Sequence, residues 1–131
     1  MIITPNYPLI YSSTFFLLPI MYGIFKKKYG LAAVSWIATI CSISYWIHPV
    51  PGIRYNTDLV VSKCCGVIYL IYAHNNISGI ILRIFVYTNG FMILCFYNTS
   101  SILYEMKSDN WVYFHMAFHF CITLNKLLTL L

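Results

Sequence analysis

The chain has 131 residues, of which 60% are hydrophobic and only 8% are charged. A soluble domain carries about three times that share of charged residues, so the composition excludes a soluble globular protein and predicts an integral membrane protein. The net charge of +5 does not indicate binding to nucleic acid, because three of the eight basic residues form one run, Lys26-Lys27-Lys28. This run directly follows an apolar segment, where basic residues report membrane topology.

Five apolar segments follow one another along the chain, each close to the roughly 20 residues that a membrane-spanning helix needs. We expect the spans at residues 8–25, 31–48, 58–73, 77–97 and 111–131. Pro19 falls inside the first span, where membrane helices tolerate proline. The sequence therefore predicts an all-α membrane protein, a five-transmembrane-helix bundle that forms a single transmembrane domain over residues 1–131.

The basic residues favour one orientation of this multi-pass bundle. With five spans, the loop at residues 26–30 and Lys126 lie on one side of the membrane, whereas Arg54 and Lys107 lie on the other. All three acidic residues belong to that second side. By the positive-inside rule, the lysine-rich side is cytoplasmic. The N-terminus is then luminal or exterior, and the C-terminus is cytoplasmic.

Two histidines, His115 and His119, lie four residues apart in an otherwise apolar stretch at the start of the last span. Residues at positions i and i+4 of a helix lie on one face, so the two imidazoles can share a metal ion if a third ligand comes from elsewhere. The alternative is a pair of packing residues that hydrogen-bond to neighbouring helices. Histidine in an apolar span is costly, which favours a functional role.

The alternation of spans brings other polar residues to the level of this pair. The end of the second span, the start of the third and the start of the fifth share one membrane face, and this predicts that His48, Asp58, His115 and His119 lie at one depth. Ser44 lies one turn before His48, and its helical face continues through Cys41 and Ile37. The fourth histidine, His74, belongs to the opposite face.

These residues match the needs of a catalytic zinc site, which uses three protein ligands and keeps one position for water. The ligands would be His48, His115 and His119. Asp58 would act as the general base toward the metal-bound water, and Ser44 would donate a hydrogen bond to a substrate oxygen. Two structural roles stay open: Asp58 could be a helix N-cap, and Ser44 could bond to a carbonyl one turn back.

The order Ser44-x3-His48, Asp58, His115-x3-His119 resembles the CREST superfamily of membrane proteins, which contains the alkaline ceramidases and the adiponectin and progestin (PAQR) receptors. The resemblance implies a shortened relative of a seven-helix fold, with Zn²⁺ on the three histidines and with Asp58 and Ser44 at the zinc-bound water. It also implies hydrolysis of a lipid amide or ester. The resemblance covers five residues, and one predicted helix stands where the family has three.

Three functions are compatible with these observations. The first is a zinc-dependent, ceramidase-like membrane hydrolase with a membrane lipid as substrate and no nucleic-acid partner. The second is a metal-binding or receptor-like membrane protein without turnover, and the third is a small channel or viroporin with a polar lining. The composition, rich in Ile, Tyr and Asn, is similar to that of small membrane proteins of large DNA viruses, which suggests an endomembrane or a viral envelope as its location.

Overall fold

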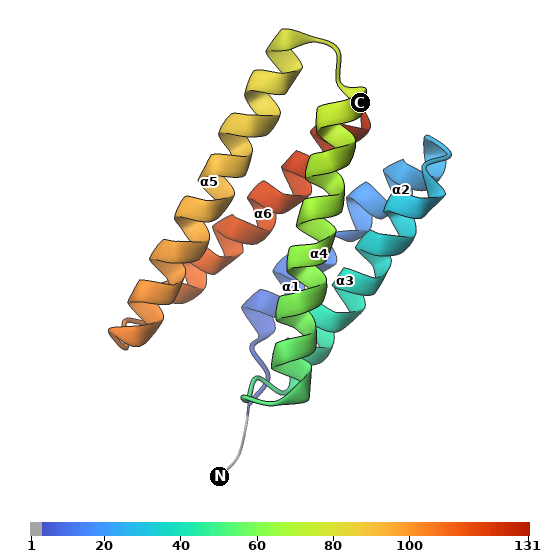
Figure 1. The fold of residues 1–131 in the computed structure, drawn as a ribbon. Coiled ribbons are helices and arrows are strands. Elements are labelled where there is room, and N and C mark those ends of the chain that lie inside the picture. Colours follow the sequence, from blue (N-terminus) through green and yellow to red (C-terminus); the bar gives the residue numbers. More distant parts are fainter. Residues whose placement is uncertain (1–3) are drawn as a thin grey trace.

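The computed structural model describes residues 4–131, and within this range the chain is all-helical, without a strand. The helices are α1 (Tyr7–Thr14), α2 (Leu17–Phe25), α3 (Tyr29–Ile47), α4 (Ile53–Asn76), α5 (Ile80–Glu105) and α6 (Trp111–Leu130). α1 and α2 follow one another in one direction, and the later helices alternate in direction to form a bundle (Figure 1). The prediction of an all-α fold is confirmed.

A proline explains why the first apolar segment consists of two helices. The interruption falls at Phe15 and Phe16, and Pro19 lies four residues after Phe15. Proline has no N–H to bond the carbonyl four residues back, and its ring clashes with that carbonyl. The N–H of Leu18 bonds to the Phe15 oxygen instead, at 3.1 Å. Pro19 therefore sets a break one turn before itself, within the predicted span.

Three helical segments are long and apolar enough to cross a membrane, namely Tyr7–Phe25, Tyr29–Ile47 and Ile80–Glu105. The described chain is thus a helical protein with three candidate membrane spans. α4 and α6 have 24 and 20 residues, which is enough length for a span, but they carry more polar residues. The prediction of five spans is met for three helices.

Two helices extend beyond the apolar segments that predicted them. α4 begins at Ile53 and not at Asp58, and α5 continues to Glu105, through residues 98–105 that we expected to form a loop. Hydropathy falls where a segment leaves the apolar region, whereas a helix ends where its backbone hydrogen bonds end. The predicted boundaries of these two helices were wrong because their ends carry polar residues.

The bundle has an apolar exterior, and its interior combines apolar with polar side chains. Large hydrophobic side chains such as Phe25, Phe91 and Leu94 are more than half exposed. The buried polar side chains come from four helices: Ser12, Ser13, Ser35, Thr39, Ser42, Ser100, His119, Thr123, Lys126 and Thr129. Small hydroxyl residues allow membrane helices to approach closely and hydrogen-bond to one another. This distribution is the one expected for a bundle surrounded by lipid.

Candidate functional site

Four helix ends meet at one end of the bundle and carry the residues predicted to form the site. α3 ends there, α4 begins, α5 ends and α6 begins (Figure 1). His48 caps the end of α3, Asp58 is in the second turn of α4, and His115 and His119 are in the first three turns of α6. His74 is near the end of α4, at the other end of the bundle. His48, Asp58, His115 and His119 therefore lie toward one end of the bundle, and His74 lies toward the other.

The structure does not bring His48 and Ser44 to the histidine pair. The buried face of α3 carries Ser35, Thr39, Ser42 and Trp46, whereas His48 is exposed and Ser44 is half-buried. A helix turns about 100° per residue, so Ser44, two positions before Trp46, points about 200° away from it, and His48 lies beyond the last residue of α3. We expected the inward face to contain Cys41 and Ile37; this was wrong, since Ile37 is 53% exposed.

The side chains of α1 and α2 explain the rotation of α3. The hydroxyl of Ser13 lies 3.2 Å from that of Ser42, and Gly23 lies so close to Ala32 that an added Cβ would be 3.3 Å from the Ala32 Cβ. A stripe of small residues on α3 thus lets the N-terminal helices approach closely. The bulkier face with Ile37 is left outside.

His115 and His119 lie in contact within the bundle. Their ring centroids are 4.8 Å apart at an angle of 78°. His119 is 2% exposed, and the ring of Phe16 packs against it at 5.1 Å. Trp46 packs edge-on against His115 at 5.2 Å. The pair is therefore surrounded by aromatic rings, in a medium where polar interactions are stronger than in water.

Serine hydroxyls from two other helices hold the Nδ1 atoms of these rings. Ser12 Oγ lies 2.7 Å from Nδ1 of His119 and donates to the carbonyl of Leu9. Ser100 Oγ lies 3.3 Å from Nδ1 of His115 and donates to the carbonyl of Trp111. A hydroxyl has one hydrogen. When the serine hydroxyl donates this hydrogen to the backbone carbonyl, the imidazole Nδ1 must donate in the hydrogen bond between serine and histidine.

This assignment leaves a lone pair on Nε2 of both rings. A neutral imidazole carries its hydrogen on one nitrogen and is an acceptor or metal ligand through the other. Metal-binding histidines usually donate their second nitrogen to an oxygen in this way, which fixes the ring and its tautomer. With Nδ1 as the donor, Ser12 and Ser100 hold the rings of His119 and His115 as oxygen partners hold metal-binding histidines. The sequence interpretation did not include Ser12 and Ser100.

The indole N–H of Trp46, beside the histidine pair, lacks a hydrogen-bond acceptor within the described part of the chain. The indole Nε1 of Trp46 is buried and has no hydrogen-bond acceptor among residues 4–131. A buried donor without an acceptor costs about 1–3 kcal/mol, so such groups are rare outside functional sites. Because the Trp46 ring contacts His115, an oxygen atom of a ligand that binds at the pair would be within the neighbourhood of this N–H.

Asp58 has a different setting from the one that its position suggested. The N-cap of α4 is Gly52, and Asp58 follows six residues later, so it does not cap the helix. It is half-buried, and it accepts a hydrogen bond from Ser62 Oγ at 3.2 Å, one turn further along α4. The N-cap role left open by the sequence is therefore excluded, and no cap function accounts for a half-buried carboxylate here.

The described residues form only part of the predicted zinc site. Within residues 4–131, no three His, Cys, Asp or Glu side chains are close enough to hold a metal ion. The arrangement fits two histidine ligands, whereas a catalytic zinc site has three protein ligands. His48 shares the end of the bundle with the pair, but its side chain is exposed.

The chain matches no protein-family model, no curated protein and no solved structure. The resemblance to the CREST superfamily is thus carried by five residues of this sequence. Of these five, the structure brings His115 and His119 into contact. Ser44 and His48 are at the end of α3, and Asp58 is near the start of α4.

Proposed function

We propose that the chain is a zinc-binding membrane protein whose metal site is built on His115 and His119, and that its activity is hydrolysis of a lipid amide or ester. The observation that supports the metal site best is the pair of serine hydroxyls on the two Nδ1 atoms. These contacts leave both Nε2 atoms available on one face of α6. His48 is the third ligand in this proposal, since it belongs to the same end of the bundle.

The hydrolytic activity rests on what surrounds the pair. Zinc, when bound at such a site, supplies an activated water molecule and polarises a carbonyl group. The Asp58 carboxylate would accept a proton, and the unpaired N–H of Trp46 would donate to a substrate oxygen. The aromatic rings at the pair exclude water and suit an apolar substrate.

In this proposal, the bundle crosses the membrane five times, with α4 and α6 as spans of lower hydropathy. In α6, His119, Thr123 and Lys126 face the interior. The N-terminus is luminal or exterior, because Lys26, Lys27 and Lys28 belong to the side that the positive-inside rule makes cytoplasmic. The substrate would reach the site from the lipid bilayer.

Metal analysis of the purified full chain in detergent tests the site. We expect one zinc ion per chain, loss of zinc in His115→Ala and His119→Ala, and weaker binding in His48→Ala. His74→Ala is the matched control, because His74 lies at the other end of the bundle, and it should keep its zinc. Absence of zinc from the wild-type chain, or full retention in His115→Ala, would refute the metal site.

A panel of fluorescent ceramides and lipid esters then separates hydrolysis from metal binding without turnover. Release of fatty acid by the wild-type chain, and its loss in His119→Ala, supports the hydrolase. Zinc binding without release on the whole panel supports the receptor-like alternative.

A channel is the second candidate, because polar side chains follow one face of α6. His119, Thr123 and Lys126 are buried at intervals of three or four residues. The ring of Phe16 lies between two of them, at 5.1 Å from the His119 ring and 5.2 Å from the Lys126 Nζ. Proton flux through reconstituted vesicles that increases in Phe16→Ala, in a chain without zinc, would favour this function.

A further inference from the structure

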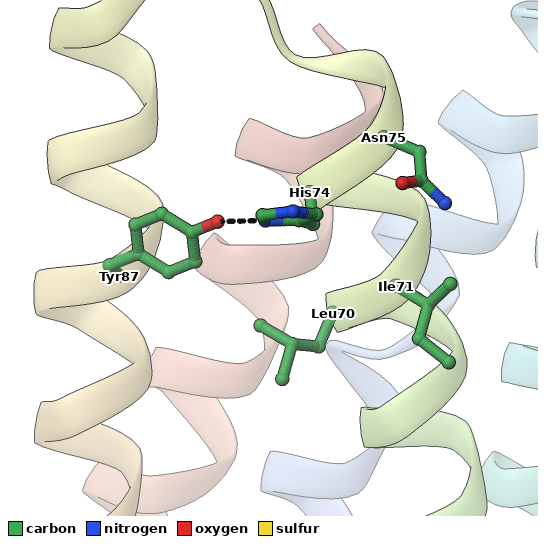
Figure 2. A pocket seen from close by; sticks show the side chains of 5 residues that line it. All are labelled: Leu70, Ile71, His74, Asn75 and Tyr87. Carbon is green, nitrogen blue, oxygen red and sulfur yellow. Dashed lines mark hydrogen bonds between the residues drawn. The ribbon is translucent and has the colours of Figure 1, made fainter.

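A groove lies between α4 and α5 at the end of the bundle opposite to the histidine pair. Its volume is about 340 Å³, and it is lined by Leu70, Ile71, His74, Asn75 and Tyr87. Tyr87 reaches from α5 toward α4, where its hydroxyl lies 2.8 Å from Nδ1 of His74 (Figure 2). Leu70 lies one turn before His74 on the same side of α4 (Figure 2). The groove therefore has a polar bridge at one end and an apolar wall beside it.

Arg83 supplies a fixed cation next to this bridge. Its Nε donates to the carbonyl of Ile77, and its Nη2 donates to the carbonyl of His74 at 3.3 Å. Arginine has five N–H groups, so these two bonds leave three of them for another partner. A guanidinium held in place in this way is well suited to bind a phosphate through parallel hydrogen bonds.

The walls of the groove face an apolar medium. Leu70 and Ile71 of α4, which line the groove, are 51% and 56% exposed. In a membrane these surfaces contact lipid chains. A molecule that occupies the groove therefore needs a hydrocarbon part as well as a polar part, and this excludes a small hydrophilic anion as its natural occupant.

The basic residues at this end of the bundle favour an occupant whose polar part is negatively charged. Lys26, Lys27 and Lys28 follow α2, and Lys126 is in the last two turns of α6, so they share this end with Arg83 (Figure 1). The acidic side chains of the chain are at the other end: Asp58, Glu105 and Asp109. Basic residues between or beside membrane helices bind anionic lipid headgroups.

We propose that the groove between α4 and α5 is a binding site for a phospholipid with an anionic headgroup. The phosphate lies at Arg83 and His74, and one acyl chain lies along Leu70. This site is distinct from the proposed zinc site and does not depend on it, since the two are at opposite ends of the bundle. It would hold a lipid of the leaflet that the lysine-rich end contacts.

Native mass spectrometry of the full chain tests this proposal with two lipids that have the same acyl chains, phosphatidylglycerol and phosphatidylcholine. We expect one phosphatidylglycerol to stay bound per chain, in clear preference to phosphatidylcholine. Arg83→Gln should weaken this binding by about fivefold or more, the change that a contribution of about 1 kcal/mol per basic group gives. Arg54→Gln removes the same charge from the other end and should not change it.

Arg83→Gln could also disturb the fold, because Arg83 donates a hydrogen bond to the carbonyl of His74 near the end of α4. Two further variants control for this effect. Tyr87→Phe keeps the ring and the charge but breaks the bridge to His74, and His74→Gln leaves Arg83 in place; both should weaken binding while the helical circular dichroism spectrum is unchanged. The proposal is refuted if both lipids bind equally, if Arg54→Gln weakens binding as much as Arg83→Gln, or if neither His74→Gln nor Tyr87→Phe has an effect. Glycerol phosphate that competes as well as the lipid would indicate a site for free phosphate instead.

Discussion

Two neighbouring serines of α1 allow a sharp test of the proposed metal site. Ser12 and Ser13 are both buried, at 1% and 0% exposure, and both hydroxyls donate to the carbonyl of Leu9. They differ in their second contact: Ser12 Oγ lies 2.7 Å from Nδ1 of His119, whereas Ser13 Oγ lies 3.2 Å from Ser42 Oγ. Replacing each by alanine removes the same atom from the same helix, but only Ser12→Ala alters the histidine.

We expect Ser12→Ala to weaken zinc binding by about 10- to 100-fold, the usual effect of removing the hydrogen-bond partner of a metal-binding histidine. This corresponds to about 1.4–2.7 kcal/mol. Ser13→Ala should bind zinc like the wild type. Each variant should lose about 1–3 kcal/mol of stability, because each leaves a buried polar group, Nδ1 of His119 or the hydroxyl of Ser42, without its partner.

Competition with a chromogenic zinc chelator measures the affinity, and thermal unfolding of the same samples measures stability. Equal zinc affinity of the two variants would refute the tautomer that we assign to His119. A loss of zinc in both, in proportion to their loss of stability, would show that the serines act through helix packing alone.

Three further substitutions test other parts of the argument. Asp58→Asn should keep fold and zinc but lose hydrolysis by about a hundredfold or more, because an amide cannot take a proton; normal turnover on the lipid panel would exclude Asp58 as the base. Trp46→Phe keeps an aromatic ring beside His115 but removes the unpaired N–H. It should therefore leave zinc unchanged and lower turnover on the order of a hundredfold, whereas unchanged turnover would make Trp46 a packing residue. Lys126→Met should not lower the unfolding midpoint: the ammonium is buried against the rings of Phe16 and Tyr69, and removing its desolvation offsets the loss of two cation–π contacts. A marked drop in the midpoint would show that the charge stabilises the bundle.

The sequence predicted which helices exist and which of their ends meet, because both follow from hydropathy and from the alternation of direction along a chain of helices. His48, Asp58 and the histidine pair were placed at one end on this basis, and His74 at the other, as in the structure. Depth in a bundle depends on the distance of a residue from a helix end, at about 1.5 Å per residue. The error of five residues at the start of α4 corresponds to about 7.5 Å of depth, which leaves a residue near the same end of a bundle of about 30 Å.

The rotation of each helix could not be predicted in the same way. An error of one residue in the inward face turns a helix by about 100°, and apolar residues surround α3 on all sides, so hydropathy does not mark its inner face. A signal was nevertheless present in the spacing of Ala32, Ser35, Thr39 and Ser42, which recur every three or four residues. In a membrane, small and hydroxyl residues mark the packed face. Given that stripe, Ser44 lies outside the packed face of α3.

The position of His48 is the point on which a two-histidine and a three-histidine site differ. His48 follows the last residue of α3 and has φ −138° and ψ 74°, a non-helical conformation, as expected for a residue before proline. Its side chain is thus not bound to the rotation of α3, which the packing of Ser42 and Trp46 fixes. A turn about the bonds of His48 alone changes its direction without disturbing the interior. Trp46, in contrast, belongs to the helix and already contacts His115. A third histidine ligand therefore has to approach from beyond the end of α3, beside the Trp46 ring, whose indole N–H has no acceptor among residues 4–131.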